Sequence, residues 1–170
     1  MNHLEHAVLL LDMIAKGRIG RKFITALIGT FLAIITVAIH VVGFDILFKA
    51  VLRLTEAPPT RGLPIAMQIM RTAWLLLFFH ALEIGMWAFF FRYAHCFPDV
   101  ESAFYFSGST YTSVGYGDLL LPTRWRLLGP IESLTGMLMC GLSASAFFAL
   151  ITRIAKARSE LMQAELRSVS

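Results

Sequence analysis

The nine residues from Thr110 to Asp118 constrain the fold most, because they separate two long apolar segments and cannot themselves form a helix. Gly115 and Gly117 stand one residue apart in this stretch, and glycines so placed weaken a helix. The whole chain is 57% hydrophobic and 15% charged, whereas soluble domains are about 45–50% apolar. Within lipid, backbone that is not helical must be shielded by protein or line a watery path. The sequence therefore predicts an integral membrane protein in which this stretch is protected, irregular backbone.

Three segments are apolar and long enough to cross a membrane, which takes about 20 residues. They are residues 23–54, 65–93 and 127–154. Between the second and third, residues 100–111 predict a helix too short to cross, with Asp99 as its N-cap. We therefore expect an all-α membrane protein with three transmembrane helices and one short re-entrant helix.

The ends of the chain differ from these spans. Residues 3–15 carry apolar side chains at helical spacing but are too short to span, so residues 1–22 predict an amphipathic segment at the membrane interface. The alternative is a frayed start of the helix that follows. A cleaved signal peptide does not fit, because the next apolar stretch is too long and has no small-residue cleavage site after it. Residues 23–62 then hold the first span and a turn-rich linker, and residues 156–170 predict a cytoplasmic tail.

The segment Thr112–Asp118 reads TSVGYGD and resembles the selectivity-filter signature of the potassium-channel superfamily. It stands in the order that such a filter needs, after a span and a short capped helix and before another span. The resemblance covers about residues 65–154, and His80, Glu83 and Glu132 fit the pattern of small bacterial ion-channel proteins with an extra N-terminal helix. It implies a pore domain over residues 63–155, with outer helix 65–93, pore helix 100–111, filter 112–118 and inner helix 127–154.

A potassium filter replaces the water shell of the ion with fixed oxygens. Backbone carbonyls can do this if residues with left-handed backbone alternate with others, and glycine adopts positive φ at little steric cost. Gly115 and Gly117 meet that need. The resemblance implies bound K⁺ at the carbonyls of Ser113, Val114, Gly115 and Tyr116, with the Ser113 hydroxyl at the inner end. The ion-binding residues expected from it are Thr112, Ser113, Val114, Gly115, Tyr116 and Gly117.

The resemblance also implies which residues support the filter. Tyr105 and Phe106 match an aromatic pair that the family places behind the filter; Tyr105 can donate a hydrogen bond and Phe106 cannot. Some members carry glutamate at the position of Ser109, paired with the filter aspartate, so we expect Asp118 to lack that partner. The negative end of the pore-helix dipole, near Thr110, favours a cation at the pore centre.

Three ionisable residues inside the apolar spans need a reason. His80 and Glu83 share one side of the second span, and Glu132 lies early in the third. We expect them to form a polar cluster that ties these helices together behind the filter, with protonated carboxyls. A pH sensor and a metal site are the alternatives. His40, in the first span, is expected at a different depth, as a packed histidine.

The third span contains two glycines, Gly136 and Gly141, where the inner helix of the family can bend. Close helix packing is the other explanation, since small residues commonly serve it in membranes. We keep both for each position.

The side of the membrane on which the chain begins follows from the filter. In this superfamily the filter faces outside, so three spans place the N-terminus outside as well. Basic residues flank the spans on both sides, and the positive-inside rule therefore does not decide. The alternative places the N-terminus inside, with residues 23–54 bent into a hairpin or lying partly in the interface.

Together these features predict a homotetrameric potassium channel in a plasma membrane, as a multi-pass protein of the bacterial inner membrane type. One copy of the motif cannot enclose an ion, so the resemblance implies four. We expect potassium ions in the filter, no organic cofactor, contact with membrane lipids and no nucleic acid, since the net charge of +4 comes from Lys and Arg beside the spans. The alternatives are a weakly selective cation channel, a non-conducting regulatory subunit, and a membrane enzyme or sensor that uses His80, Glu83 and Glu132. No catalytic constellation is visible.

Overall fold

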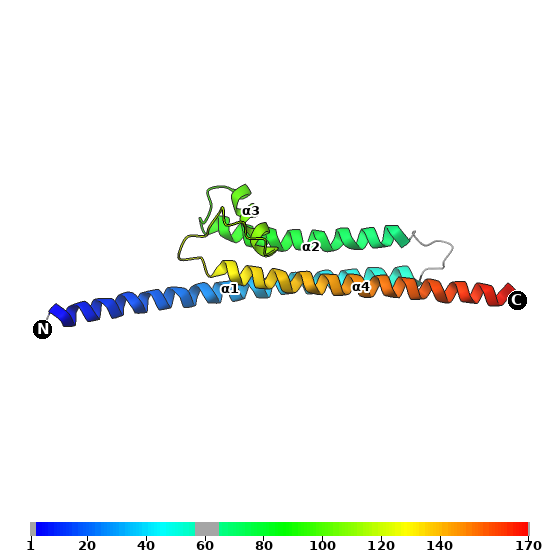
Figure 1. Cartoon of the computed structure of the whole chain (residues 1–170), viewed down its shortest axis with the longest axis horizontal. Coiled ribbons are helices and arrows are strands. Elements are labelled where there is room, and N and C mark those ends of the chain that lie inside the picture. The colour runs from blue at the N-terminus through cyan, green and yellow to red at the C-terminus, as the bar shows by residue number, and fades with distance from the viewer. Residues whose placement is uncertain (1–2, 57–64, 170) are drawn as a thin grey trace. The chain divides into compact units, whose positions relative to one another are not determined.

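A computed structural model describes residues 3–56 and 65–169. Figure 1 labels its helices in chain order, which are α1 (His3–Glu56), α2 (Ile65–Tyr93), α3 (Val100–Tyr111) and α4 (Leu128–Val169). The linker expected at the end of residues 23–62 lies largely outside the described residues, and residues 156–169 of the expected tail continue α4.

Three of these helices contain a segment long and apolar enough to cross a membrane. The candidate spans are Gly20–Lys49, Ala66–Tyr93 and Leu128–Arg153. The short α3 lies between the second and third of them in the chain. The expected all-α architecture, three long apolar helices with one short helix between, is confirmed.

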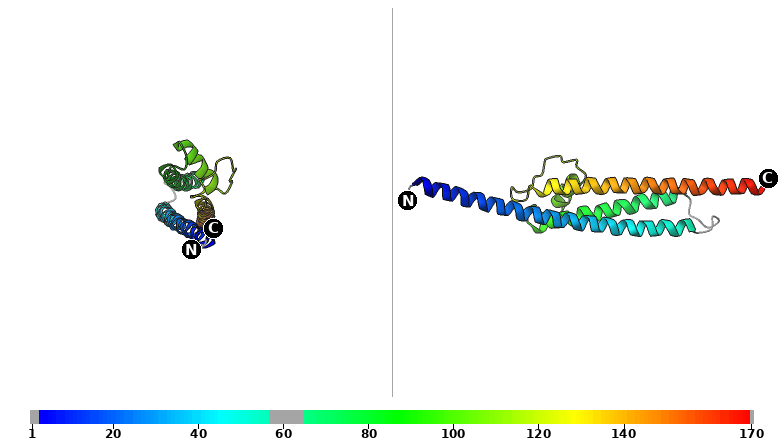
Figure 2. Two further views of the ribbon diagram at one scale, coloured as in Figure 1. Left: turned by 90° about the vertical axis from the view of Figure 1, so that its left-hand side faces the viewer. Right: turned by 90° about the horizontal axis from the view of Figure 1, so that it is seen from below.

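The first helix is longer than we expected. We treated residues 1–22 as a segment apart from the first span, but α1 runs from His3 to Glu56 without a break, as Figure 2 also shows. A glycine inside a helix costs only about 1 kcal/mol relative to alanine, so Gly17 and Gly20 do not interrupt so long a helix. The hairpin considered for residues 23–54 is therefore wrong. An interfacial position for residues 1–22 stays a prediction.

The structure divides into two compact units, each built from parts of all three long helices. Unit 1 contains the chain up to Thr36 together with Ile84–Met137, and so holds α3 and the loop Thr112–Asp118, named the 112–118 loop below. Unit 2 contains Val37–Glu83 and the chain from Leu138 onward. Every contact described below lies within one of these units.

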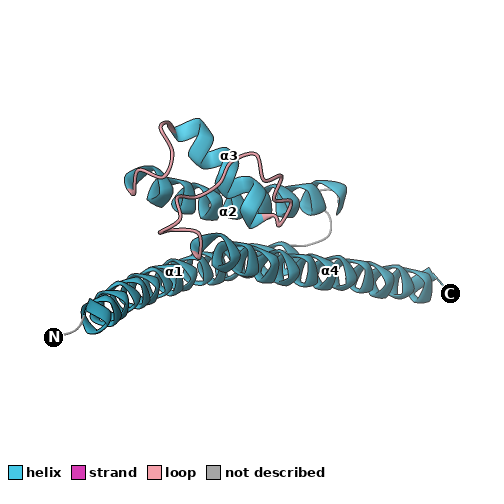
Figure 3. Cartoon of the chain, turned by 60° about the vertical axis from the view of Figure 1, so that its left-hand side comes forward, coloured by secondary structure: helices cyan, strands magenta, loops and turns pink. Residues whose placement is uncertain are grey.

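An aromatic core in unit 1 holds α3 in place. Trp87 and Phe91 of α2 are fully buried, and Phe91 meets Phe106 of α3 edge to face, with ring centroids 5.3 Å apart. Trp125, from the loop before α4, belongs to the same cluster. Trp87 also donates a hydrogen bond of 3.0 Å from Nε1 to Thr36 Oγ1 of α1. Each buried aromatic side chain removes about 150–250 Å² from water, so this core holds α3 against α2. Figure 3 shows α3 with the loops that precede and follow it.

Candidate functional site

The predicted cap starts α3. Asp99 has extended backbone, with φ −139° and ψ 167°, and its side chain accepts a hydrogen bond of 2.7 Å from the N–H of Ser102. That N–H lowers the pKa of the Asp99 carboxyl below its ordinary value, because it stabilises the charged form. Glu101 adds a second acidic side chain in the first turn. The helix therefore begins at a fixed residue, and its negative end lies at Tyr111, directly before the 112–118 loop.

The 112–118 loop is bonded to the last turn of α3. The N–H of Ser113 donates to the carbonyl of Thr110 at 2.9 Å, and the N–H of Gly115 donates to the carbonyl of Ser109 at 3.0 Å. Carbonyls at a helix C-terminus have no partner within the helix, so these bonds satisfy two of them. The first half of the loop is thereby anchored to the helix.

Left-handed backbone recurs at every second residue of the loop. Ser113, Gly115 and Gly117 have φ of 61°, 54° and 77°, while Val114 and Tyr116 between them do not have positive φ. Backbone that alternates in this way can turn successive carbonyls toward one axis, which ordinary helix and strand cannot do. The two glycines were expected at positive φ; Ser113 extends the alternation by one more residue.

Tyr105 supports the C-terminal end of the loop. Its hydroxyl donates a hydrogen bond of 2.8 Å to Asp118 Oδ2, and its ring stacks on that of Tyr116, with centroids 6.4 Å apart and planes 10° apart. The bond to Asp118 raises the pKa of Tyr105, because ionisation would remove the donated hydrogen. Ser109 instead donates from its hydroxyl to the carbonyl of Phe106 inside α3. Asp118 is therefore held by Tyr105, while the Ser109 hydroxyl bonds within α3.

The α4 helix makes two contacts near the point where α3 ends and the 112–118 loop begins. Ser133 Oγ lies 2.8 Å from Ser113 Oγ. One turn further along α4, a Cβ added at Gly136 would lie 2.1 Å from the carbonyl oxygen of Tyr111. Gly136 therefore lets α4 approach the backbone of α3, which favours packing over bending at this position. A Cβ at Gly141 would meet nothing within 4 Å, so a bend there stays a prediction.

Glu132 of α4 is fully buried against Ser107 of α3. Ser107 Oγ lies 2.9 Å from the carbonyl oxygen of Ile84 and 2.5 Å from Glu132 Oε1. A hydroxyl has one hydrogen to donate, and a carbonyl can only accept. If Ser107 donates to Ile84, the contact with Glu132 needs a hydrogen from the carboxyl itself. Within the part of the chain that the structure describes, Glu132 Oε2 is buried without a hydrogen-bond partner, which also favours the neutral acid over a carboxylate.

Each unit holds part of the polar cluster expected from the sequence, and a cluster of His80, Glu83 and Glu132 together stays a prediction. Glu132 meets Ser107 in unit 1, whereas Glu83 Oε1 lies 2.7 Å from His40 Nδ1 in unit 2, with His80 on the same side of α2. The expectation that His40 lies at another depth is therefore wrong, although its packed state is confirmed, since it is 2% exposed. The depth of one helix against another is set by packing between them, and no local pattern in the first span recorded it.

The residues that sequence reasoning missed are mostly serines. Ser107 and Ser143 each bond a side chain on another helix, and Ser133 bonds Ser113 of the 112–118 loop. A lone serine in an apolar span has little to distinguish it. The spacing of Ser133 and Gly136, one turn apart on α4, is the signal that could have shown a face packed on the 112–118 loop.

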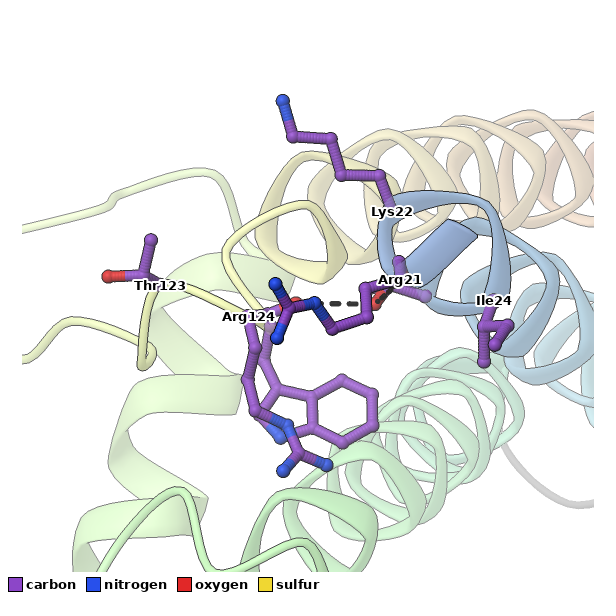
Figure 4. Close-up of a pocket in the computed structure, with 7 residues that line it drawn as sticks. Arg21, Lys22, Ile24, Thr123 and Arg124 are labelled. Carbon is purple, nitrogen blue, oxygen red and sulfur yellow. Dashed lines mark hydrogen bonds between the residues drawn. The ribbon is translucent and has the colours of Figure 1, made fainter. Parts of the chain in front are cut away.

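The N-terminal half of α1 contacts the loop that follows the 112–118 loop. Thr25 Oγ1 lies 3.2 Å from the carbonyl oxygen of Arg124 and 2.9 Å from that of Arg21 one turn earlier, so its single hydrogen serves these two acceptors. Beside it is a cavity of about 640 Å³ lined by Arg21, Lys22, Arg124 and Trp125, among others. Figure 4 shows the side chains of Arg21 and Arg124 at this cavity, with Lys22 extending away. Residues 21–25 and 123–125 therefore lie at the same end of unit 1.

Comparison with known protein families gives one match. Residues 75–153 match a family model described as ion channel, which covers the chain from within α2, through α3 and the 112–118 loop, into α4. Comparisons with curated proteins and with solved structures find no match. The matched family is one of channels and not of enzymes, so the enzyme alternative has no support. The chain is a multi-pass membrane protein with three candidate spans, and its residues 75–153 are similar to the domain of ion channels.

Proposed function

We propose that this chain forms a potassium-selective channel, in which four copies conduct K⁺ passively through the 112–118 loop. The observation that carries the proposal is the alternation of positive φ at Ser113, Gly115 and Gly117. The loop follows the negative end of α3, which favours a cation at that point. In this assignment the carbonyls of residues 113–116 replace the hydration shell of the ion, as filters of backbone carbonyls do.

The exposure of the loop supports assembly into a homotetramer. Within one chain Val114 is 54% exposed and Tyr116 is 70% exposed, although the loop is bonded at both ends to α3. A single loop presents oxygens to one side of an ion only, and lipid would leave its backbone groups unsatisfied. Neighbouring copies around one axis cover these side chains and complete the ring of oxygens. Potassium ions in the loop, neighbouring subunits and lipid are then the partners of each chain.

The contact between α1 and the loop near Arg124 supports one topology. Thr25 and Arg124 lie at the same end of unit 1, and in a channel of this kind the loop after the filter faces outside. The N-terminus is then outside a plasma membrane, which would be the inner membrane in a bacterium. A reporter fused at Met1 tests this placement; a cytoplasmic signal would contradict it.

Flux measured from liposomes that contain the purified full-length protein tests the function. We expect K⁺ flux with little Na⁺ flux. The variant Gly115→Ala should abolish selective flux, because an L-residue at positive φ costs about 1–2 kcal/mol in each chain. Gly129→Ala is the matched control, since a Cβ at Gly129 meets nothing within 4 Å. Equal fluxes of both ions would show a weakly selective channel, and the absence of flux would favour a non-conducting regulatory subunit. Either result contradicts the proposal, as does a Gly115→Ala variant whose selective flux is unchanged.

A further inference from the structure

Four polar side chains from three helices meet inside unit 2, away from the 112–118 loop in the chain. They are His40 of α1, His80 and Glu83 of α2, and Ser143 of α4. Glu83 is fully buried, His40 is 2% exposed and the His80 side chain is 15% exposed. All four lie in candidate membrane spans, where buried ionisable groups are costly and need a function or a partner.

Each histidine faces Glu83 with its Nδ1 atom and Ser143 with its Nε2 atom. On one side, His40 Nδ1 lies 2.7 Å from Glu83 Oε1 and His80 Nδ1 lies 3.7 Å from Glu83 Oε2. On the other, the Nε2 atoms of His80 and His40 lie 3.0 Å and 3.2 Å from Ser143 Oγ. The side chains therefore close a ring of four contacts, with the carboxyl and the hydroxyl at opposite corners.

The ring carries three hydrogen bonds and one longer contact. A neutral histidine carries one N–H, serine carries one O–H, and an ionised carboxylate carries none, so three hydrogens serve the three contacts that are short enough for hydrogen bonds. The fourth contact, between His80 Nδ1 and Glu83 Oε2, is 3.7 Å long, which is too long for a hydrogen bond. An ionised Glu83 brings a negative charge into an apolar span. A cation between the two Nδ1 atoms and the carboxylate would balance that charge.

We propose that His40, His80 and Glu83 bind a divalent transition-metal ion, with zinc the best fit. Two histidines and one carboxylate form a three-ligand set that zinc uses in proteins. One ligand atom from each residue lies within 4.8 Å of the others. Zinc bonds of about 2.0–2.2 Å place tetrahedral neighbours about 3.3–3.5 Å apart. The 3.7 Å contact is already close to that spacing, and the 2.7 Å contact has to open by less than about 1 Å.

Ser143 fits the outer shell of such a site. Metal on both Nδ1 atoms leaves a hydrogen on both Nε2 atoms, and a hydroxyl oxygen has two lone pairs that accept them. Histidines that bind metal almost always donate their other N–H to an acceptor, and loss of that acceptor weakens binding about 10–100-fold. The bound ion would join α1 to α2, and Ser143 would join both to α4, independently of what passes through the 112–118 loop.

Zinc titration of the full-length protein in detergent, after treatment with a chelator, tests the proposal. Competition with a chromophoric chelator gives the affinity and the number of sites, and cobalt in place of zinc gives visible absorption bands from a tetrahedral site. We expect one ion per chain. His40→Gln, His80→Gln and Glu83→Gln should each weaken binding at least about 100-fold, whereas His95→Asn, which removes an exposed histidine outside the cluster, should leave it unchanged.

Ser143→Ala keeps the proposal testable if the ligand variants do not fold, because it retains all three ligands. An affinity about 10–100-fold weaker supports the site, and an unchanged affinity overturns it. Wild-type protein that binds no more zinc than Glu83→Gln also overturns it, as does uptake of a proton by the cluster without any zinc binding.

Discussion

Substitution of Gly136 by alanine should weaken the packing of α4 on Tyr111, the residue that precedes the 112–118 loop. The added Cβ would lie 2.1 Å from the carbonyl oxygen of Tyr111 and 2.9 Å from its carbonyl carbon and Cγ. Ordinary van der Waals contact begins at 3.4 Å, so α4 and the end of α3 must separate by more than about 1 Å. The obstacle is backbone in a buried residue, which cannot rotate away as the tip of a flexible side chain can.

The magnitude follows from two opposing effects. Overpacking in a well-packed interior costs about 1–3 kcal/mol, and a backbone obstacle places this site at the upper end. Alanine is favoured over glycine inside a helix by about 1 kcal/mol. We therefore expect Gly136→Ala to destabilise each chain by about 2 kcal/mol, or about 30-fold in the folding equilibrium. Because Tyr111 directly precedes the loop, selective K⁺ flux should fall as well.

Thermal melting of the purified protein and flux from liposomes measure the two effects. Gly129→Ala, on the same helix with open space around its Cβ, should match the wild type in flux and equal or exceed it in stability. If Gly136→Ala has the same melting temperature and K⁺ flux as Gly129→Ala, α4 does not pack on the Tyr111 carbonyl. The role of this contact in supporting the loop is then refuted.

Three further substitutions test the parts around the loop. Ser102 lowers the pKa of Asp99 in the folded chain, so the cap stabilises the protein above the ordinary pKa of aspartate and loses that effect as pH falls through the lowered value. In thermal melts between pH 3 and 7, Asp99→Asn should lack this loss of stability on the acid side. An identical pH profile for the variant and the wild type would contradict the cap. Tyr105→Phe removes the hydroxyl that holds Asp118, so K⁺ flux should decay faster during sustained conduction, and unchanged decay would show that the bond does not support the loop. Glu132→Gln keeps a donor for Ser107, so its free energy of unfolding should stay within about 1 kcal/mol of the wild-type value, whereas that of Glu132→Ala should fall by about 2–4 kcal/mol. Equal losses in the two variants would contradict a neutral Glu132.

The sequence predicted the parts of the fold that depend on local signals. Long apolar runs marked the spans, Asp99 marked the start of the short helix, and the paired glycines marked backbone that leaves the helical region. Each of these follows from a few neighbouring residues, because burial in lipid and helix capping act locally. The same reasoning did not foresee that α1 begins at His3 and continues into the first span, because the small cost of two glycines does not end a helix of this length.

Contacts between helices could not be predicted in the same way. Whether His40 lies level with Glu83, or Ser133 level with Ser113, depends on how far one helix slides along another, and one turn moves a side chain by about 5.4 Å. That register is set by packing over the whole interface. Without it, the contact of His40 with Glu83 and the contact of Ser133 with Ser113 could not be predicted.

If the chain forms the proposed channel, the two contacts of α4 near the end of α3 have a consequence for how conduction can be controlled. Ser133 and Gly136 lie one turn apart and touch residues 113 and 111, on either side of the point where α3 ends. At Gly136 the neighbouring atom belongs to the backbone of Tyr111, so it cannot rotate away when α4 moves toward it. A tilt of α4 at this level would therefore shift the Tyr111 carbonyl and the Ser113 hydroxyl together. A bend at or beyond Gly141, where a Cβ meets nothing, would leave both contacts in place, so this geometry separates control at the loop from control further along α4.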